Sequence, residues 1–127
     1  MVLFLQVSRS PVMGAYLTFV RNKALASSGT YPDENFAREL MQLFTIGLWK
    51  LNPDGTPVLN SQGEQIATYT NDDIMSFARV WTGFDTQQMR GNIEFMTGAN
   101  LIDPMQIKPA WHDIFPKSNL DGGYLGT

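Results

Sequence analysis

The sequence predicts an α+β protein that is mainly helical: three short helices, with a small antiparallel β-meander inserted between the second and third. Two observations predict this class. Apolar residues recur at helical spacing in three segments, and two tight-turn sequences stand close together between the last two of these segments. The chain therefore divides into an N-terminal segment (1–31), a helix–meander–helix core (32–84) and an irregular tail rich in glycine and proline (85–127).

The composition narrows the class of protein. Hydrophobic residues make up 43% of the 127 residues and charged residues 17%, which is typical of a folded domain. The net charge of −3 argues against nucleic acid as the main partner. Disulfides and thiolate metal sites are excluded because the chain has no cysteine. No apolar run approaches the roughly 20 residues that a membrane-spanning helix needs.

The charges are distributed unevenly along the chain. Residues 1–31 contain Arg9, Arg21 and Lys23 and no acidic residue, whereas residues 32–127 contain all 12 acidic residues and six basic ones. This asymmetry suggests that the first segment lies against the acidic remainder of the chain, although a solvated basic loop explains it equally well.

The first predicted helix covers residues 11–20. Ser10 is a good N-cap residue, and Pro11 suits the first helical position. Before it, residues 2–7 form an apolar run too short to be assigned as a helix or a strand. After it, residues 21–31 are rich in small residues and are expected to form a loop.

The second predicted helix begins at Pro32 and ends at Gly47. Asp33 and Glu34 fall in its first turn, where carboxylates interact favourably with the helix dipole, and this role explains the two adjacent acids better than a catalytic pair does. One apolar stripe is expected from Phe36, Leu40, Leu43 and Phe44. The opposite, polar stripe is formed by Asn35, Arg38, Glu39 and Gln42.

Two turns predict the meander. Asn52-Pro53-Asp54-Gly55 is typical of a type I turn followed by a left-handed glycine, and Asn60-Ser61-Gln62-Gly63 forms a second turn. The three short strands are expected near residues 48–52, 56–59 and 64–68.

The third predicted helix starts after Thr70, which is spaced from Asp73 as in a capping box, and ends at Gly83. Its apolar face consists of Ile74, Phe77, Ala78 and Trp81. In the tail, only one short helical turn is expected, after Pro109.

The polar face of the second helix is the strongest candidate for a site. Glu39 could act as a general base with Arg38 holding an anion and Asn35 orienting it, but an adjacent arginine lowers the pKa of a carboxylate. We favour a structural polar network of Asn35, Arg38, Glu39 and Arg79, because ion-pair networks resemble sites in sequence. If Arg38 is a buried pairing residue, Arg38→Ala should lower stability by roughly 3–5 kcal/mol.

The remaining polar candidates are assigned structural roles. His112 is the only histidine and no G-x-S-x-G sequence accompanies it, so a loop histidine is favoured over a catalytic one. Turn chemistry rather than calcium binding explains the polar residues Asp54, Asn60, Gln62 and Glu64, which lack the EF-hand spacing. The sequence therefore predicts no catalytic residues, no cofactor and no metal site.

Aromatic residues form a second group of candidates. Trp49, Trp111 and Tyr124 are candidate contact residues on strands or loops. They serve either as packing between segments or for stacking on a sugar or a pigment ring.

The chain resembles the DUF1800 family, a large group of mostly bacterial proteins of unassigned function. The matching segments, in the order of the family, are "SPVMGAYL" (10–17), "PDENFARELMQLFTIGL" (32–48), "LNPDGTPVL" (51–59), "TYTNDDIMSFARVWTGF" (68–84), "IDPMQIKP" (102–109) and "WHDIFPKSNLDGGYLG" (111–126). Members of the family are longer, so the resemblance implies that this chain is a single partial domain, or fragment. It also hints at an extracytoplasmic or organellar location, and it supplies no reaction.

The function expected from these observations is that of a structural or interaction module, which packs against a protein partner, a second copy of itself or the rest of a larger domain. Two alternatives stay open. One is an extracytoplasmic hydrolase-like enzyme using Glu39, Asp72 or Asp73, and His112. The other is a module that binds carbohydrate or pigment through its aromatic residues.

Overall fold

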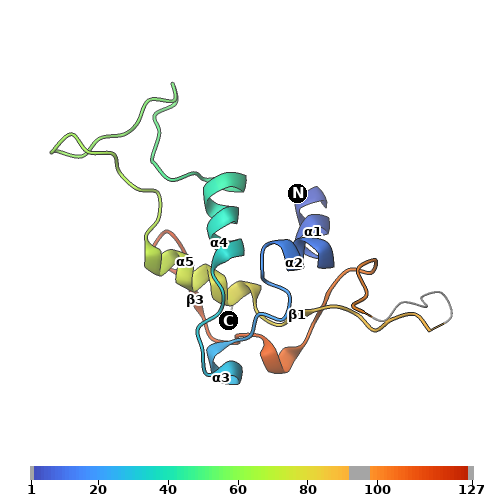
Figure 1. Cartoon of the computed structure of the whole chain (residues 1–127). Coiled ribbons are helices and arrows are strands. Elements are labelled where there is room, and N and C mark those ends of the chain that lie inside the picture. The colour runs from blue at the N-terminus through green and yellow to red at the C-terminus, as the bar shows by residue number, and fades with distance from the viewer. Residues whose placement is uncertain (1, 92–97, 126–127) are drawn as a thin grey trace.

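The computed structural model describes residues 2–91 and 98–125 of the chain (Figure 1). Within these residues the fold is α+β, as predicted, with five α-helices and two small antiparallel sheets. The predicted number of three helices is too low. Residues Val2–Ser8 form a helix (α1), and the predicted loop 21–31 contains another, α3 (Leu25–Ser28). Segments this short do not complete enough turns for apolar spacing to reveal a helix.

Helix α2 (Pro11–Tyr16) begins where the sequence predicts, with Pro11 at its first position. It ends four residues earlier than predicted, because the chain leaves the helical conformation at Thr18, whose φ is 61°. The turn that follows places Phe19 in the core.

The second predicted helix is α4 (Asn35–Glu39), which continues as a π-helix, η1 (Leu40–Thr45). It begins three residues later than predicted. The carboxylate of Asp33 accepts a hydrogen bond from the backbone N–H of Asn35 at 2.8 Å. Asp33 therefore satisfies one of the free N–H donors at the start of the helix.

The prediction of one apolar stripe on this helix is partly wrong. Phe36 and Leu40 are buried, but Leu43 and Phe44 are 67% and 57% exposed, while Met41 enters the core. The π-helix explains the difference, because its wider turns rotate the residues that follow relative to α-helical spacing.

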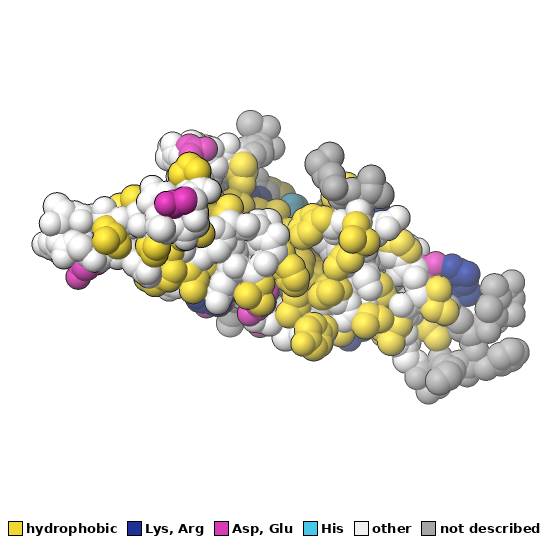
Figure 2. Space-filling view, turned by 90° about the horizontal axis from the view of Figure 1, so that it is seen from above, with side chains coloured by type: hydrophobic (Ala, Val, Ile, Leu, Met, Phe, Trp, Pro, Cys, Tyr) yellow, Lys and Arg dark blue, Asp and Glu magenta, His cyan; other side chains and the backbone are white. Residues whose placement is uncertain are grey.

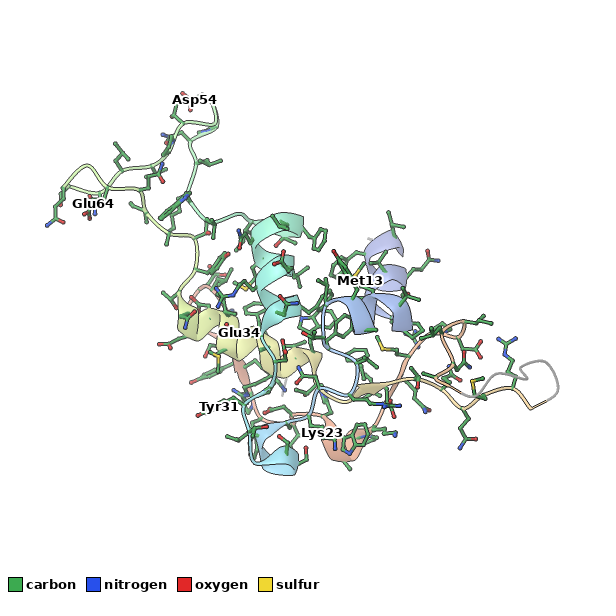
Figure 3. All side chains as sticks on the ribbon, in the orientation of Figure 1. Met13, Lys23, Tyr31, Glu34, Asp54 and Glu64 are labelled. Atoms are coloured by element: carbon green, nitrogen blue, oxygen red, sulfur yellow. The ribbon has the colours of Figure 1, made fainter. Side chains whose placement is uncertain are left out.

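Residues 48–68, which we call the β-arm, contain the predicted meander in a modified form. Three isolated antiparallel bridges join the expected strands, Trp49 with Ala67, Leu51 with Pro57 and Leu59 with Gln65. Each segment therefore pairs with both of the others instead of forming a flat meander. Figure 1 shows the β-arm extending away from the helices, and in Figure 3 Asp54 and Glu64 mark its two tips.

A ring of three backbone hydrogen bonds holds the centre of the β-arm. Lys50 N–H donates to the carbonyl of Ile66 (2.8 Å), Ile66 N–H to Val58 (3.1 Å), and Val58 N–H to Lys50 (2.8 Å). This closed ring satisfies three donors and three acceptors where the three segments meet, so the β-arm keeps its shape although it has little buried side-chain core.

Helix α5 (Asn71–Ala78) continues as a 3-10 turn, η2 (Arg79–Trp81). The predicted capping box is confirmed, since Thr70 and Asp73 exchange side-chain to backbone hydrogen bonds. Ile74 and Ala78 are buried against α4, as the predicted apolar face requires.

The prediction of an irregular tail is partly wrong. β1 (Phe84–Asp85) pairs with β2 (Gln106–Ile107), and β3 (Lys117–Ser118) pairs with β4 (Tyr124–Leu125), both antiparallel. The expected turn after Pro109 is present as η3 (Pro109–Trp111). Two-residue strands give no period in sequence, so only their pairing partners define them.

Two small clusters of buried residues form the core. One contains Leu17, Phe19, Phe36 and Met105, and the other contains Ala37, Met41, Ile74 and Ala78. Trp81 packs against both clusters, and its ring meets that of Phe36 edge-on at 4.6 Å between centroids. The end of α5 is thereby fixed relative to α2 and α4, and this in turn positions the residues of η2.

Candidate functional site

The polar face of α4 forms a surface ion pair. Arg38 pairs with Glu34 one turn earlier and lies 3.4 Å from the side chain of Asn71 on α5. The side chain of Arg38 is 37% exposed. Within residues 2–91 and 98–125, the side chains of Asn35 and Glu39 form no hydrogen bond or ion pair. The structure therefore places Arg38 with Glu34 and Asn71, and apart from the other two residues of the predicted network on this helix.

Arg79, the fourth residue of the predicted network, lies in a different group. It makes a two-point contact with Asp113, with Nε 3.0 Å from Oδ2 and Nη2 2.9 Å from Oδ1. The carboxylate of Asp113 is 8% exposed. The structure therefore does not join Arg79 to Arg38.

Asp113 is the centre of a polar cluster, which we call the Asp113 cluster and which consists of Arg79, Thr82, His112, Asp113 and Lys117. The hydroxyl of Thr82 accepts the backbone N–H of Asp113 at 2.8 Å and donates to the carbonyl of Arg79 at 2.8 Å. Lys117 donates to the carbonyl of Asp113. These bonds fix the loop before β3 on the end of α5.

His112 is held by its backbone and one ring nitrogen. Nδ1 lies 2.8 Å from the carbonyl oxygen of Thr82, which can only accept, so we assign a proton to Nδ1. The loop packs closely here, because a Cβ added to Gly83 would lie 2.9 Å from Cβ of His112.

The ionisation state of Asp113 follows from these contacts. Burial by itself raises the pKa of Asp113, but the hydrogen bonds from Arg79 and from the N–H of Phe115, with the charges of Arg79 and Lys117, outweigh burial and bring the pKa below its ordinary value of 3.8. Asp113 in turn raises the pKa of Arg79. Because both oxygens of the carboxylate accept hydrogen bonds, Asp113 is a fixed anion suited to holding the loop rather than to accepting a proton.

Two cavities flank the Asp113 cluster. One, of about 240 Å³, is lined by residues including Ala24, Ser27 and His112, and the other, of about 370 Å³, by residues including Leu25, Tyr31 and Arg79. Asp113 and Phe115 border both. Ser27 donates its hydroxyl to the carbonyl of Ala24 at 3.0 Å. This geometry offers a concave, mainly apolar surface with one fixed ion pair, which suits binding better than proton transfer.

Sequence reasoning named Arg79 and His112 but missed Asp113, Thr82 and Lys117 as their partners. The only sequence signal was the position of Asp113 between Pro109 and Pro116, a loop that needs an anchor to be ordered. Arg79 and Thr82 lie 34 and 31 residues from Asp113 in sequence, so their proximity to it depends on the fold, whereas Lys117 is only four residues away.

The three candidate aromatic residues lie on different elements. Trp49 is at the base of the β-arm, Trp111 ends η3, and Tyr124 is on β4, where it is 73% exposed. No ring contact in the described part of the chain joins any two of them. Trp111 contacts two lysines, Lys23 and Lys108, whose ammonium nitrogens lie 4.4 and 4.1 Å from its ring centroid.

Residues 2–91 and 98–125 contain no group of three or more His, Cys, Asp or Glu side chains arranged to hold a metal ion. In the same residues, every helix is too short or too polar to cross a membrane.

The fold and the site therefore define a class of protein: a small α+β protein in which the Asp113 cluster holds a loop in place and a β-arm projects from the helices. Residues 2–125 match the family model described as "Protein of unknown function (DUF1800)". The chain belongs to this family. No curated protein and no solved structure matches it.

Proposed function

We propose that this chain is an interaction module whose exposed apolar surface packs against another protein surface. The surface, which we call the apolar face, runs from α1 over η1 to the β-arm. Its exposed residues are Leu3, Leu5, Leu43, Phe44, Ile46, Leu48, Trp49, Leu51 and Leu59. In Figure 2, hydrophobic side chains gather over the middle of the molecule as seen from above.

The total surface area carries the proposal. The chain exposes 8630 Å², whereas a compact monomer of 14.2 kDa exposes about 6,800 Å². The excess is about a quarter of the expected area, and it exceeds the roughly 800 Å² that each partner contributes to a standard interface. A chain of this size therefore has enough surplus surface for a stable interface.

A groove within the apolar face supports the same proposal. A groove of about 290 Å³ runs between α1 and η1 and is lined by apolar side chains: Leu3, Phe4, Val7, Met13, Phe36 and Phe44. Single exposed apolar residues are normal on any protein, but a contiguous patch with a groove marks an interaction site.

The experiment that tests this function is a light-scattering measurement of the purified chain, with binding of a hydrophobic dye. Without its partner, the chain is expected to cover the apolar face by self-association and to show a mass above 14.2 kDa. The double variant Leu43→Asp/Phe44→Asp should return it towards the monomer. Ile114→Asp is the matched control, because Ile114 is 74% exposed but lies outside the apolar face.

A monomer that melts cooperatively and binds no dye would contradict the proposal. The same conclusion would follow if Ile114→Asp dissociated the assembly as fully as the double variant does. In either case the apolar face would not be what drives association.

A further inference from the structure

We propose that Arg21, Lys23 and Lys108, grouped around Trp111, form a binding site for a tetrahedral oxyanion, namely a phosphate or sulfate dianion, either free or as an ester. We call this group the basic cluster. It shares no residue with the Asp113 cluster.

The contacts of the basic cluster form one continuous chain. Arg21 Nε lies 3.2 Å from Oδ1 of Asp85, and Lys108 pairs with Oδ2 of the same carboxylate. Lys108 and Lys23 both lie over the ring of Trp111. Lys23 is seen in Figure 3 beside the 3-10 turn that carries Trp111.

The charges in this chain of contacts do not balance. Arg21 and Lys108 share the single carboxylate of Asp85, and in the described part of the chain Lys23 forms no ion pair. Both ammonium groups lie within 4.4 Å of one ring centroid, so they are closer to each other than the Debye length of about 10 Å and repel. The ring face attracts each cation but supplies no net negative charge.

A bound dianion would balance this surplus of positive charge. If Asp85 served only to hold the segments together, one of the two cations that its carboxylate binds would be enough. Arg21 uses only Nε on Asp85, so within residues 2–91 and 98–125 its two terminal nitrogens have no hydrogen-bond partner, and its side chain is 65% exposed. Guanidinium and ammonium groups, which Arg21 and Lys108 bring to one carboxylate, are the donors that phosphate and sulfate prefer.

The cluster is held in place by the backbone. Arg21 N–H donates to the carbonyl of Phe84 at 2.7 Å, Lys108 N–H to that of Gly83 at 2.8 Å, and Ala24 N–H to that of Trp111 at 2.8 Å. Three segments distant in sequence are therefore fixed side by side before any ligand arrives, which lowers the entropic cost of binding.

The sequence indicated this site only through the uneven distribution of basic and acidic residues along the chain. Arg21 and Lys23 belong to the basic N-terminal segment, and Arg21 does contact an acidic residue of the remainder. Lys108, however, comes from the acidic part of the sequence. The positive charges therefore gather only when β2 pairs with β1, which in turn binds the backbone of Arg21.

The test is an NMR titration of the full chain, with the indole N–H signal of Trp111 identified through Trp111→Phe. Inorganic phosphate and glucose 6-phosphate are added separately at about pH 7.5, where both are mainly dianions, and chloride keeps the ionic strength constant. Saturable shifts at Trp111, with a dissociation constant of about 1 mM or below, are expected for at least one of them.

Variants separate a built site from general charge attraction. Lys23→Gln should weaken binding by about tenfold, since it removes a charged donor, and Lys23→Arg should retain most of the affinity. Lys50→Gln is the matched control, because it removes one positive charge from the β-arm and should leave the affinity within about twofold.

The two ligands distinguish the sources of the anion. Equal affinities would support a site for the free ion, and tighter binding of glucose 6-phosphate would support an ester whose organic part also contacts the protein. If neither ligand saturates by about 10 mM, or if Lys50→Gln weakens binding as much as Lys23→Gln does, the proposal is overturned.

Discussion

Arg79 and Asp113 are joined by two parallel hydrogen bonds across 34 residues of sequence, from Nε and Nη2 on one edge of the guanidinium to the two oxygens of the carboxylate. This contact fixes the loop that precedes β3 on the end of α5. Asp113 also borders both cavities beside the Asp113 cluster, and Arg79 borders the larger of these two. The geometry of the guanidinium, and not only its charge, is what allows both bonds to form together.

Arg79→Met is expected to lower the free energy of unfolding by about 3 kcal/mol, because it leaves the carboxylate of Asp113 buried without its main partner. Arg79→Lys keeps the charge but loses one of the two bonds, so a loss of about 1.5 kcal/mol is expected. Urea unfolding of the three proteins measures both values. Equal stability of Arg79→Lys and the unmodified chain would show that the two-point geometry contributes nothing.

Arg38→Met should have a much smaller effect, about 0.5 kcal/mol, and serves as the control for Arg79→Met. Arg38 pairs with Glu34 one helical turn away and remains 37% exposed, and exposed pairs of this spacing contribute little. A loss of roughly 3–5 kcal/mol was expected only if Arg38 were a buried pairing residue. Arg38 is not buried, so that larger loss is not expected. A loss as large as that of Arg79→Met in the same urea experiment would reverse this ranking.

Stability should fall at acid pH. The pKa values of Asp85 and Asp113 lie below 3.8 in the folded chain, because hydrogen bonds from Lys108 and Arg21, and from Arg79, outweigh the effect of burial. The unfolded chain then binds more protons than the folded one. The stabilisation is fully present above the ordinary pKa and is lost as the pH falls through the folded-state values.

The measurement is the urea midpoint from about pH 7 down to about pH 3, and the midpoint should fall mainly below about pH 5. Asp113→Asn should be less stable at neutral pH and less sensitive to acid. A midpoint that stays constant across the range would mean that these ion pairs are not formed in solution.

Gly83→Ala should destabilise the chain more than Gly55→Ala does. Both glycines have left-handed φ values, 86° and 84°, which cost an L-residue about 1–2 kcal/mol. A Cβ at Gly83 also meets Cβ of His112 at 2.9 Å, whereas at Gly55 nothing lies within 4 Å. The difference in melting temperature between the two variants isolates the crowding, which we expect to cost about 1–3 kcal/mol more. Equal shifts would show that the loop relaxes around the added methyl group.

Local signals in the sequence predicted local structure well. The capping box at Thr70, the start of α2 at Pro11 and the turn after Pro109 each depend on residues within four positions of one another, and each is confirmed. Boundaries were less accurate. The end of α2 and the π-helix of η1 depend on how the chain packs, and periodicity carries no information about packing.

The candidate site was predicted only in part. Arg79 and Trp111 were singled out from the sequence, but their contacts with Asp113, and with Lys23 and Lys108, were not. Charged side chains find partners by proximity in space, and sequence spacing predicts proximity only within a helix or a hairpin. Arg38 and Glu34 satisfy that condition and form the pair that spacing four allows.

The sequence by itself determined the α+β class, the capping box of α5 and the turns of this member of the DUF1800 family, because short-range sterics and hydrogen bonding decide these features. Tertiary structure alone decided which apolar residues stay exposed on the apolar face and which charges gather in the Asp113 and basic clusters. Both outcomes depend on bringing segments from across the chain together. The free energy that does so comes from burying residues such as Phe19, Phe36 and Met105, which lie far apart in the sequence.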